Sequence, residues 1–173
     1  MLTLSLLRHA KSSWNHPALG DFDRPLAPRG INAAPVIGQY MRHHGFNPDL
    51  VLCSAAQRTR ETLSLVLPFL EGNLELHIDD ALYHAAGAED LLSLIHKYGN
   101  RHSHLLLIGH NPALEALAKQ LVTSGAAAAR DAMESKFPTA ALAVISFRAE
   151  TWSKVRGDGR LERFETPKRL RQV

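Results

Sequence analysis

Hydrophobic positions along the chain gather in short apolar runs, and these runs alternate with longer segments in which apolar residues recur every three or four positions. A short, nearly continuous apolar run is typical of a strand buried on both faces, whereas the wider spacing is typical of an amphipathic helix. On this pattern we predict strands over residues 2–7, 49–53, 74–78, 105–108, 140–147 and 161–164.

The segments between these runs carry the start and stop signals of helices. Pro28 precedes an amphipathic stretch that continues through Met41, and Gly45 is its expected end. Ser54 and Gln57 have the spacing of a capping box, so Ser54 is the expected cap of the next helix. We therefore predict helices over 28–41, from 54 through 66, over 88–98, and from an Asn111 cap with Pro112 at the first helical position through 121, with a short helix or a loop over 126–129.

Strands that alternate with helices predict a mostly parallel sheet covered on both faces, which is a three-layer α/β/α domain. The 173 residues suffice for one such domain with a full hydrophobic core. We therefore predict a single domain over residues 1–173, with a basic C-terminal tail from about residue 168. In parallel sheets ligands bind beyond the carboxyl ends of the strands, so chemistry is expected at that edge.

Composition places the chain among ordinary globular proteins, with 45% hydrophobic and 21% charged residues. The apolar run at the N-terminus stops at Arg8, which is too early for a signal peptide or a membrane span. Cys53 is the only cysteine, so no internal disulfide can form. A reducing compartment, the cytoplasm, is therefore the expected location.

The net charge of +3 is unevenly distributed. Residues 154–173 contain seven Lys and Arg residues and three acids, whereas the rest of the chain is nearly neutral. A basic end can indicate nucleic-acid or membrane binding. Because no aromatic residues are interleaved with the charges of the last turn, we favour a solvated end and expect neither a nucleic acid nor a membrane as a partner.

Three of the predicted strands end in residues that attract phosphate. Arg8 and His9 follow the first strand, Arg58 lies in the first turn of the helix after the second strand, and His110 follows the strand over 105–108. Arginine binds phosphate through two parallel hydrogen bonds, and helix N-termini attract anions through their free N–H groups. Each of these residues alone is unremarkable, but their coincidence at one edge of the sheet predicts a phosphate site.

These residues also resemble a known family. The segment Leu6-Leu7-Arg8-His9-Ala10 resembles the Arg-His-Gly signature of the histidine phosphatase superfamily, although Ala10 stands where that signature usually has glycine. Three further segments are similar in chain order to motifs of its members, the first of them to the small SixA-type phosphohistidine phosphatases: Asp23-Arg24-Pro25-Leu26 followed by Arg29-Gly30, Cys53-Ser54 followed by Arg58-Thr59 and Glu61-Thr62, and Ile108-Gly109-His110-Asn111-Pro112.

The resemblance implies a phosphoglycerate mutase-like fold and a metal-independent phosphatase without a cofactor. His9 would be the nucleophile and would form a phosphohistidine intermediate, while Arg8, Arg58 and a protonated His110 would bind the phosphoryl oxygens. The implied substrate is phosphohistidine in a protein, with a histidine phosphotransfer domain as a candidate partner and a role in signal transduction.

The ten histidines also raise the alternative of a metal site. His102 with His104, and His43 with His44, are the tightest groups, but neither pair has the partners or the spacing of a zinc site. We predict that both pairs lie on the surface and that the chain holds no metal.

A general acid is not evident in the sequence. The superfamily's mutases and broad phosphatases commonly have a carboxylate after the third strand, but this chain has Ala81-Leu82-Tyr83-His84 there. His84 and Asp21 are the candidates, and a surface role for His84 is the simpler interpretation. SixA-type members likewise tend to lack the usual acid.

Three alternatives to a protein phosphohistidine phosphatase stay open on the sequence. One is a small-molecule phosphomonoesterase or a phosphoglycerate mutase-like enzyme, for which the missing carboxylate is the main objection. Another is a phosphate-binding module without catalysis, although such a module has no need of His9. The last and weakest is a nucleic-acid binder that uses the basic C-terminal end.

Overall fold

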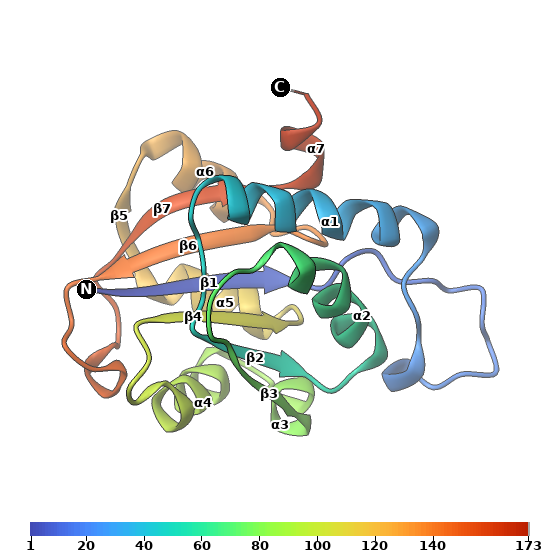
Figure 1. Ribbon diagram of the computed structural model, residues 1–173, viewed down its shortest axis with the longest axis horizontal. Coiled ribbons are helices and arrows are strands. Elements are labelled where there is room, and N and C mark those ends of the chain that lie inside the picture. The colour runs from blue at the N-terminus through green and yellow to red at the C-terminus, as the bar shows by residue number, and fades with distance from the viewer. Residues whose placement is uncertain (173) are drawn as a thin grey trace.

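The computed structural model describes residues 1–172 of the chain (Figure 1). Within this range the strands form one sheet in the order β3-β2-β4-β1-β6-β7-β5. The strands β3, β2, β4 and β1 run parallel, β6 runs antiparallel to both of its neighbours, and β5 is parallel to β7. The bounds of the strands are β1 Leu2–Arg8, β2 Leu50–Ser54, β3 Glu75–Asp79, β4 His104–Gly109, β5 Val122–Gly125, β6 Leu142–Phe147 and β7 Gly159–Glu165.

Helices cover both faces of this sheet. Among the described residues they are α1 Pro28–His43, α2 Gln57–Val66, α3 Asp80–His84, α4 Ala88–Gly99, α5 Ala113–Leu121, α6 Ala127–Ser135 and α7 Pro167–Leu170. Short 3₁₀ helices lie at η1 Asp21–Asp23, η2 Leu67–Phe69 and η3 Trp152–Lys154. No helix within residues 1–172 is both long enough and apolar enough to cross a membrane.

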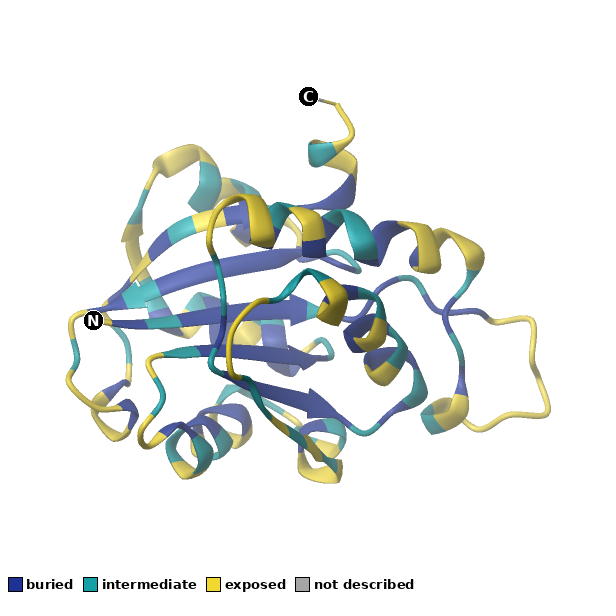
Figure 2. Cartoon of the chain, viewed as in Figure 1, coloured by how far each residue is buried: buried dark blue, intermediate teal, exposed yellow. Residues whose placement is uncertain are grey.

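The sheet divides the hydrophobic core into two clusters, because successive side chains along each strand point to opposite faces of the sheet. Leu106 and Ile108 of β4 belong to a cluster with residues of α1 and α2. Leu105 and Leu107 of the same strand belong to a second cluster, with residues of α4, α5 and α6. The central strands are therefore buried on both faces, as Figure 2 shows. This arrangement confirms the predicted three-layer α/β/α fold with a mostly parallel sheet.

All of the strands predicted from the apolar runs are present, with bounds within two residues of those expected. Pattern alone did not predict β5, α3 or the full extent of α6. The predicted caps were wrong. Helix α2 begins after Ala56, without a side-chain cap, because Ser54 is the last residue of β2 and its hydroxyl group bonds elsewhere. Helix α5 begins after Pro112 instead of Asn111, because the Asn111 amide donates to the carbonyl of Phe137.

The basic C-terminal segment, expected as a solvated tail from about residue 168, begins with a short helix, and its Lys168, Arg169 and Arg171 are exposed. Residues 167–170 form α7, where the Thr166 hydroxyl accepts a hydrogen bond from Arg169 N–H and Leu170 packs against the core beneath α1. Val173, the last residue of the predicted tail, lies outside the described residues.

One glycine allows α1 to approach the segment that follows β1. A Cβ atom on Gly30 would lie 2.2 Å from the carbonyl oxygen of Lys11. The same oxygen accepts a hydrogen bond of 2.8 Å from Ala27 N–H. This close contact fixes the start of α1 beside the end of β1, which is the edge of the sheet where chemistry was expected.

Candidate active site

The carboxyl ends of β1, β2 and β4 meet at one edge of the sheet and bring the predicted residues together. Arg8 pairs with Gly109 in the parallel register of β1 and β4, and His9 N–H donates to the Gly109 carbonyl over 3.1 Å. The His9 and His110 rings therefore lie side by side, with their centroids 5.3 Å apart. Ser54, at the end of β2, contacts His110 from the other side, with 2.7 Å between Oγ and Nε2.

The His9 side chain is buried, with 6% of the residue exposed, and its tautomer follows from one contact. Nδ1 lies 2.7 Å from the Ala10 carbonyl oxygen, which can only accept a hydrogen bond. Nδ1 must therefore carry the ring proton, which leaves the lone pair on Nε2. Burial, helped by the charges of His110, Arg58 and Arg8, lowers the pKa of His9 to about 3 against the opposing effect of that carbonyl. The ring is consequently neutral at neutral pH.

Backbone contacts hold His9 in place from two directions. Ala10 N–H donates to Thr62 Oγ1 over 3.0 Å, and the Thr62 hydroxyl donates in turn to the Arg58 carbonyl over 2.7 Å. Ala140 N–H donates to the carbonyl oxygens of Arg8 and His9 at 3.1 and 3.0 Å. Ala140 has a φ of 59°, a left-handed conformation that is unusual for a residue with a Cβ atom. The two hydrogen bonds to the end of β1 therefore hold Ala140 in a strained backbone conformation, in the loop before β6.

Arg8 and Arg58 each keep one buried guanidinium donor without a partner among residues 1–172. Arg8 Nη1 donates to the Phe137 carbonyl over 3.0 Å, while Arg58 donates through Nη1 and Nη2 to the main chain and the carboxylate of Asp21, over 2.7 and 3.0 Å. The Nε atoms of both arginines are buried and bond to nothing among residues 1–172. Buried donors without partners are rare in folded proteins and often mark a site for a ligand.

His110 has one occupied and one open ring nitrogen. Its Nε2 contacts Ser54, whereas its Nδ1 is buried and has no partner within the described part of the chain. Burial lowers the pKa of His110 to about 4, and the nearby charge of Arg58 adds to this effect. Without a ligand the His110 ring is therefore neutral at neutral pH, and its protonation with a phosphoryl group bound stays a prediction. A neutral ring can still donate from Nδ1 when the Ser54 hydroxyl donates to Nε2.

Asp21 is bound by three side chains at the rim of the site. Its Oδ2 accepts from Arg58 Nη2 and from the Tyr83 hydroxyl, and its Oδ1 accepts from Arg24. Partial burial alone would raise the pKa of Asp21, but the hydrogen bonds from Tyr83, Arg58 and Arg24 outweigh it and lower that pKa to about 2. In this arrangement Asp21 carries no proton at neutral pH and orients Arg58.

His84, the other candidate acid, is separated from His110 by the Tyr83 ring, which contacts both histidine rings. Its residue is exposed, and its ring contacts the Tyr83 ring edge-to-face at 5.1 Å. The side chain lines a shallow surface hollow together with Asp90 and Lys97. No hydrogen bond joins it to His9 or His110 in the part of the chain that the structure describes. This position agrees with the surface interpretation.

Sequence reasoning missed Tyr83 and the role of Arg24. Arg24 is buried, donates to Ser12 Oγ over 2.6 Å, and lies 3.8 Å from the centroid of the exposed Trp14 ring. The sequence motif that contains Arg24 was recognised, but the motif does not indicate that Arg24 donates to Asp21. Tyr83 precedes the candidate acid by one residue, and only the folded chain brings its hydroxyl group to Asp21.

The histidine pairs considered as metal ligands do not form a metal-binding group among residues 1–172. Within residues 1–172, no group of three or more His, Cys, Asp or Glu side chains is arranged to hold a metal ion. His43 and His44 are exposed, as expected. His102 and His104, also expected on the surface, are half-buried, and their ring nitrogens lie close to Glu75 and Ser5, respectively.

Comparisons with known proteins agree with this geometry. The family model for the histidine phosphatase superfamily (branch 1) matches residues 4–86. An uncharacterized protein from Mycobacterium tuberculosis (strain H37Rv) is 36% identical over 165 residues, which cover 94% of this chain and all of the relative. Identity over nearly the full length of both chains shows that they share a fold and a family. Together with the SixA-type structures described next, these matches show that the protein belongs to the histidine phosphatase superfamily and is a phosphatase.

Solved structures narrow this assignment. A structure assigned as a SixA phosphohistidine phosphatase from Agrobacterium tumefaciens is 32% identical, with a TM-score of 0.80 over 96% of this chain and 98% of that one. A second one, from Nakamurella multipartitia, is 30% identical, with a TM-score of 0.82 over 96% of each chain. The chain is accordingly a SixA-type member of the superfamily, with a phosphoglycerate mutase-like fold.

Proposed function

We propose that the protein hydrolyses phosphohistidine in a protein substrate through a phosphorylated His9 and without a metal ion. The observation that carries the proposal is the state of the His9 ring. A buried, neutral imidazole with its lone pair fixed on Nε2 is a nucleophile that needs no base. A site that only binds phosphate has no use for such a group.

The reaction takes two steps. In the first step Nε2 of His9 attacks phosphorus and the P–N bond of the substrate breaks, with its electron pair staying on the substrate nitrogen. The second ring nitrogen of the substrate takes a proton from solvent, so neutral imidazole leaves. In the second step water attacks the phosphorus of phospho-His9, which releases inorganic phosphate and a proton and restores the neutral ring.

Arg8, Arg58 and His110 are proposed to bind the phosphoryl oxygens in both steps. Phosphoryl transfer depends mainly on positioning and on positive charge around the equatorial oxygens. The unpartnered Nε atoms of the two arginines and Nδ1 of His110 are donors that such oxygens can satisfy. A bound phosphate dianion would also raise the pKa of His110 toward its usual value, so the imidazolium expected from the sequence could form once the ligand is present.

The substrate class follows from the leaving group. Cleavage of an alkyl phosphate expels an alkoxide, and a placed general acid typically contributes about 10²–10⁴-fold to such a step. Imidazole leaves more easily, because its conjugate acid has a pKa of about 6.5. Asp21 is deprotonated, and His84 is exposed and separated from His110 by the Tyr83 ring, so the site is matched to a P–N bond.

Hydrolysis of small phosphate esters is the second candidate, and Asp21 is the observation that favours it. Its carboxylate lies 3.0 Å from Arg58 Nη2, where a phosphate would compete for the same donor. Displacement of Asp21 by the ligand would weaken its hydrogen bonds and raise its pKa, so that it could deliver a proton.

We infer that the substrate is a phosphorelay protein, with a histidine phosphotransfer domain as the first candidate, and that the protein acts in signal transduction in the cytoplasm. Cys53 is compatible with a reducing compartment, since it is a buried free thiol and burial raises its pKa to about 12.

A panel of substrates tests the proposed function. Purified protein would be given a phosphohistidine peptide, the matching phosphoserine peptide, phosphoglycerate and p-nitrophenyl phosphate, with His9→Ala as the control. We expect the highest kcat/KM for phosphohistidine and an intermediate value for p-nitrophenyl phosphate, because phenolate also leaves easily. If phosphoserine or phosphoglycerate is the best substrate, the second candidate replaces the first, and Asp21→Asn and His84→Ala identify the acid.

A further inference from the structure

A cleft of about 600 Å³ lies beside the candidate active site, between the start of α1, the segment before β6, and α7. We call it the basic cleft, because its charged lining residues are all cations: Lys11, Arg29, Lys136, Lys168 and Arg171. The other lining residues are neutral, so no carboxylate offsets these five charges from within the cleft.

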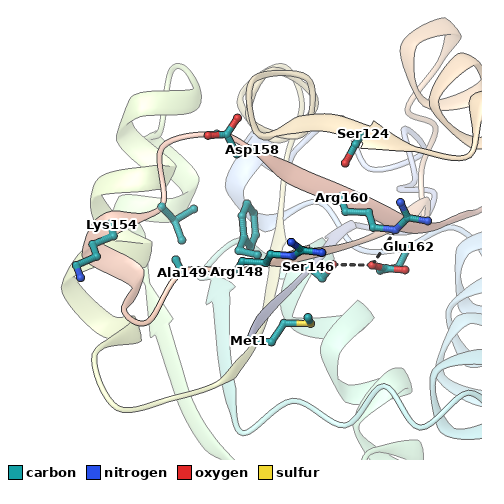
Figure 3. Close-up of a pocket in the computed structure, with 12 residues that line it drawn as sticks. Met1, Ser124, Ser146, Arg148, Ala149, Lys154, Asp158, Arg160 and Glu162 are labelled. Carbon is teal, nitrogen blue, oxygen red and sulfur yellow. Dashed lines mark hydrogen bonds and ion pairs between the residues drawn. The ribbon is translucent and has the colours of Figure 1, made fainter.

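The five cations are also free of ion pairs elsewhere. Among residues 1–172, none of them has a carboxylate oxygen within 4 Å. A second hollow, at the opposite end of the sheet, shows the contrast (Figure 3). There Arg160 lies 3.5 Å from Glu162, which also accepts from Ser146. That hollow mixes carboxylates with cations, and one of its arginines is paired within the lining, whereas the basic cleft holds cations alone and can attract an external anion.

The basic cleft shares its backbone with the candidate active site. Lys11 follows His9 by two residues, so their Cα atoms lie at most about 7.6 Å apart. On the other side, Pro138 and Thr139 line the cleft between Phe137, whose carbonyl accepts from Arg8, and Ala140, whose N–H donates to His9. A molecule whose phosphoryl group reaches His9 would therefore pass beside the cleft.

We propose that the basic cleft binds the carboxylates of an acidic segment next to the phosphohistidine of the protein substrate, an inference that rests on the proposed function. Exposed lysine and arginine side chains match flexible carboxylates on another protein surface, and five unpaired cations favour a segment with several acids over a neutral one. The cleft would raise the association rate and select the substrate, while the phosphoryl group is bound separately by Arg8, Arg58 and His110.

The experiment compares two phosphohistidine peptides that differ only in charge, one with Asp and Glu beside the phosphohistidine and one with Asn and Gln in their place. The variant is the double substitution Lys136→Glu with Arg171→Glu. The matched control is Lys97→Glu with Arg148→Glu, which changes the net charge equally at two exposed residues outside the cleft. The measured quantity is the ratio of kcat/KM for the acidic peptide to that for the neutral peptide.

We expect a ratio of roughly ten in the wild type and in the control, and a ratio near or below one in the cleft variant, because exposed charge pairs contribute modestly and additively. Raising the salt concentration should reduce the wild-type ratio, since the pairs are exposed. The same ratio in the wild type and in the cleft variant would overturn the inference.

A binding measurement separates this inference from the proposed function. The unphosphorylated acidic peptide should bind the wild type and the control roughly tenfold more tightly than the cleft variant. If no phosphohistidine peptide is hydrolysed, the proposed function fails, but this comparison still decides the role of the cleft. Tighter binding of inorganic phosphate than of the acidic peptide, lost in the cleft variant, would overturn the inference in favour of a small-anion site.

Discussion

Replacing Arg58 with lysine tests whether the site recognises phosphate by geometry or by charge alone. Arg58 is buried, lies in the first turn of α2, and uses two of its nitrogens on Asp21 while its Nε atom stays free. Lysine keeps the positive charge but offers one ammonium group in place of the planar fork. The variant therefore removes at least one charge-assisted hydrogen bond to a bound phosphoryl group.

The expected loss follows from the strength of that bond. A hydrogen bond to a charged group contributes about 1.5–3 kcal/mol, and every 1.36 kcal/mol corresponds to a tenfold change in rate. We expect kcat/KM for Arg58→Lys to fall by roughly 10–150-fold. Arg58→Gln, which also removes the charge, should lose at least about 10²–10³-fold, as does removal of a donor from an oxyanion site.

The assay is steady-state hydrolysis of p-nitrophenyl phosphate and of a phosphohistidine peptide, with thermal unfolding measured in parallel. Arg60→Lys is the matched control, because Arg60 lies on the same helix and is exposed, and within residues 1–172 its side chain donates only to Gln57. The control should retain activity within about twofold, since exposed contacts of this kind contribute little. Activity of Arg58→Lys within twofold of the wild type, in a folded protein, would refute the reasoning that the fork binds phosphate.

Three further predictions concern the metal requirement and the two histidines. Activity should persist after dialysis against a strong chelator, because guanidinium groups supply the positive charge around the phosphoryl group; recovery that depends on added zinc or magnesium would contradict this. In ¹⁵N spectra the His9 ring should stay neutral, with Nδ1 protonated, down to about pH 4. The folded pKa of His9, about 3, lies below that of the unfolded ring, so the free energy of unfolding should decrease as the pH falls from about 6.5 toward 3. A titration of His9 near pH 6.5 would rule this out. Ser54→Ala should lower kcat by roughly 5–10-fold, because the hydrogen bond that orients His110 contributes about 1 kcal/mol. Ser5→Ala, which breaks the similar contact to His104 at the other end of β4, should leave kcat within twofold. Equal effects of the two serine variants would argue against a positioning role for Ser54.

The strands and the main site residues could be predicted because the sequence carries strong local signals for them. The strand over His104–Gly109 is an almost continuous apolar run, and His110 follows it directly. Once the apolar runs are taken as parallel strands, the meeting of Arg8, His9 and His110 at one edge follows from the geometry of such sheets.

The missed features depend on contacts that local pattern does not encode. Strand β5, Val122–Gly125, has only one apolar side chain and pairs at the edge of the sheet with β7, so no apolar run marks it. Ser54 has the spacing of a helix cap, but the folded chain brings His110 within hydrogen-bond distance of its hydroxyl group, and that contact takes precedence.

The electrostatic features were also beyond the sequence. Tyr83 and Asp21 are separated by 62 positions, so their hydrogen bond gives no signal in either segment. The protonation state of His110 without a ligand depends on how deeply the ring is buried, and burial lowers its pKa. The shape and the charge of the basic cleft likewise arise from three segments far apart in the chain.

The most direct test of the central claim is to trap the phosphorylated enzyme during turnover. Protein mixed rapidly with labelled phosphohistidine peptide and quenched in base should carry a phosphate that is stable to base, labile to acid, and located by peptide mapping on His9. The His9→Ala variant should be folded, should still bind vanadate weakly, and should retain no more than a few per cent of wild-type turnover, about the level expected from the pocket alone. A phosphate on any other residue, or full turnover by His9→Ala, would contradict the account.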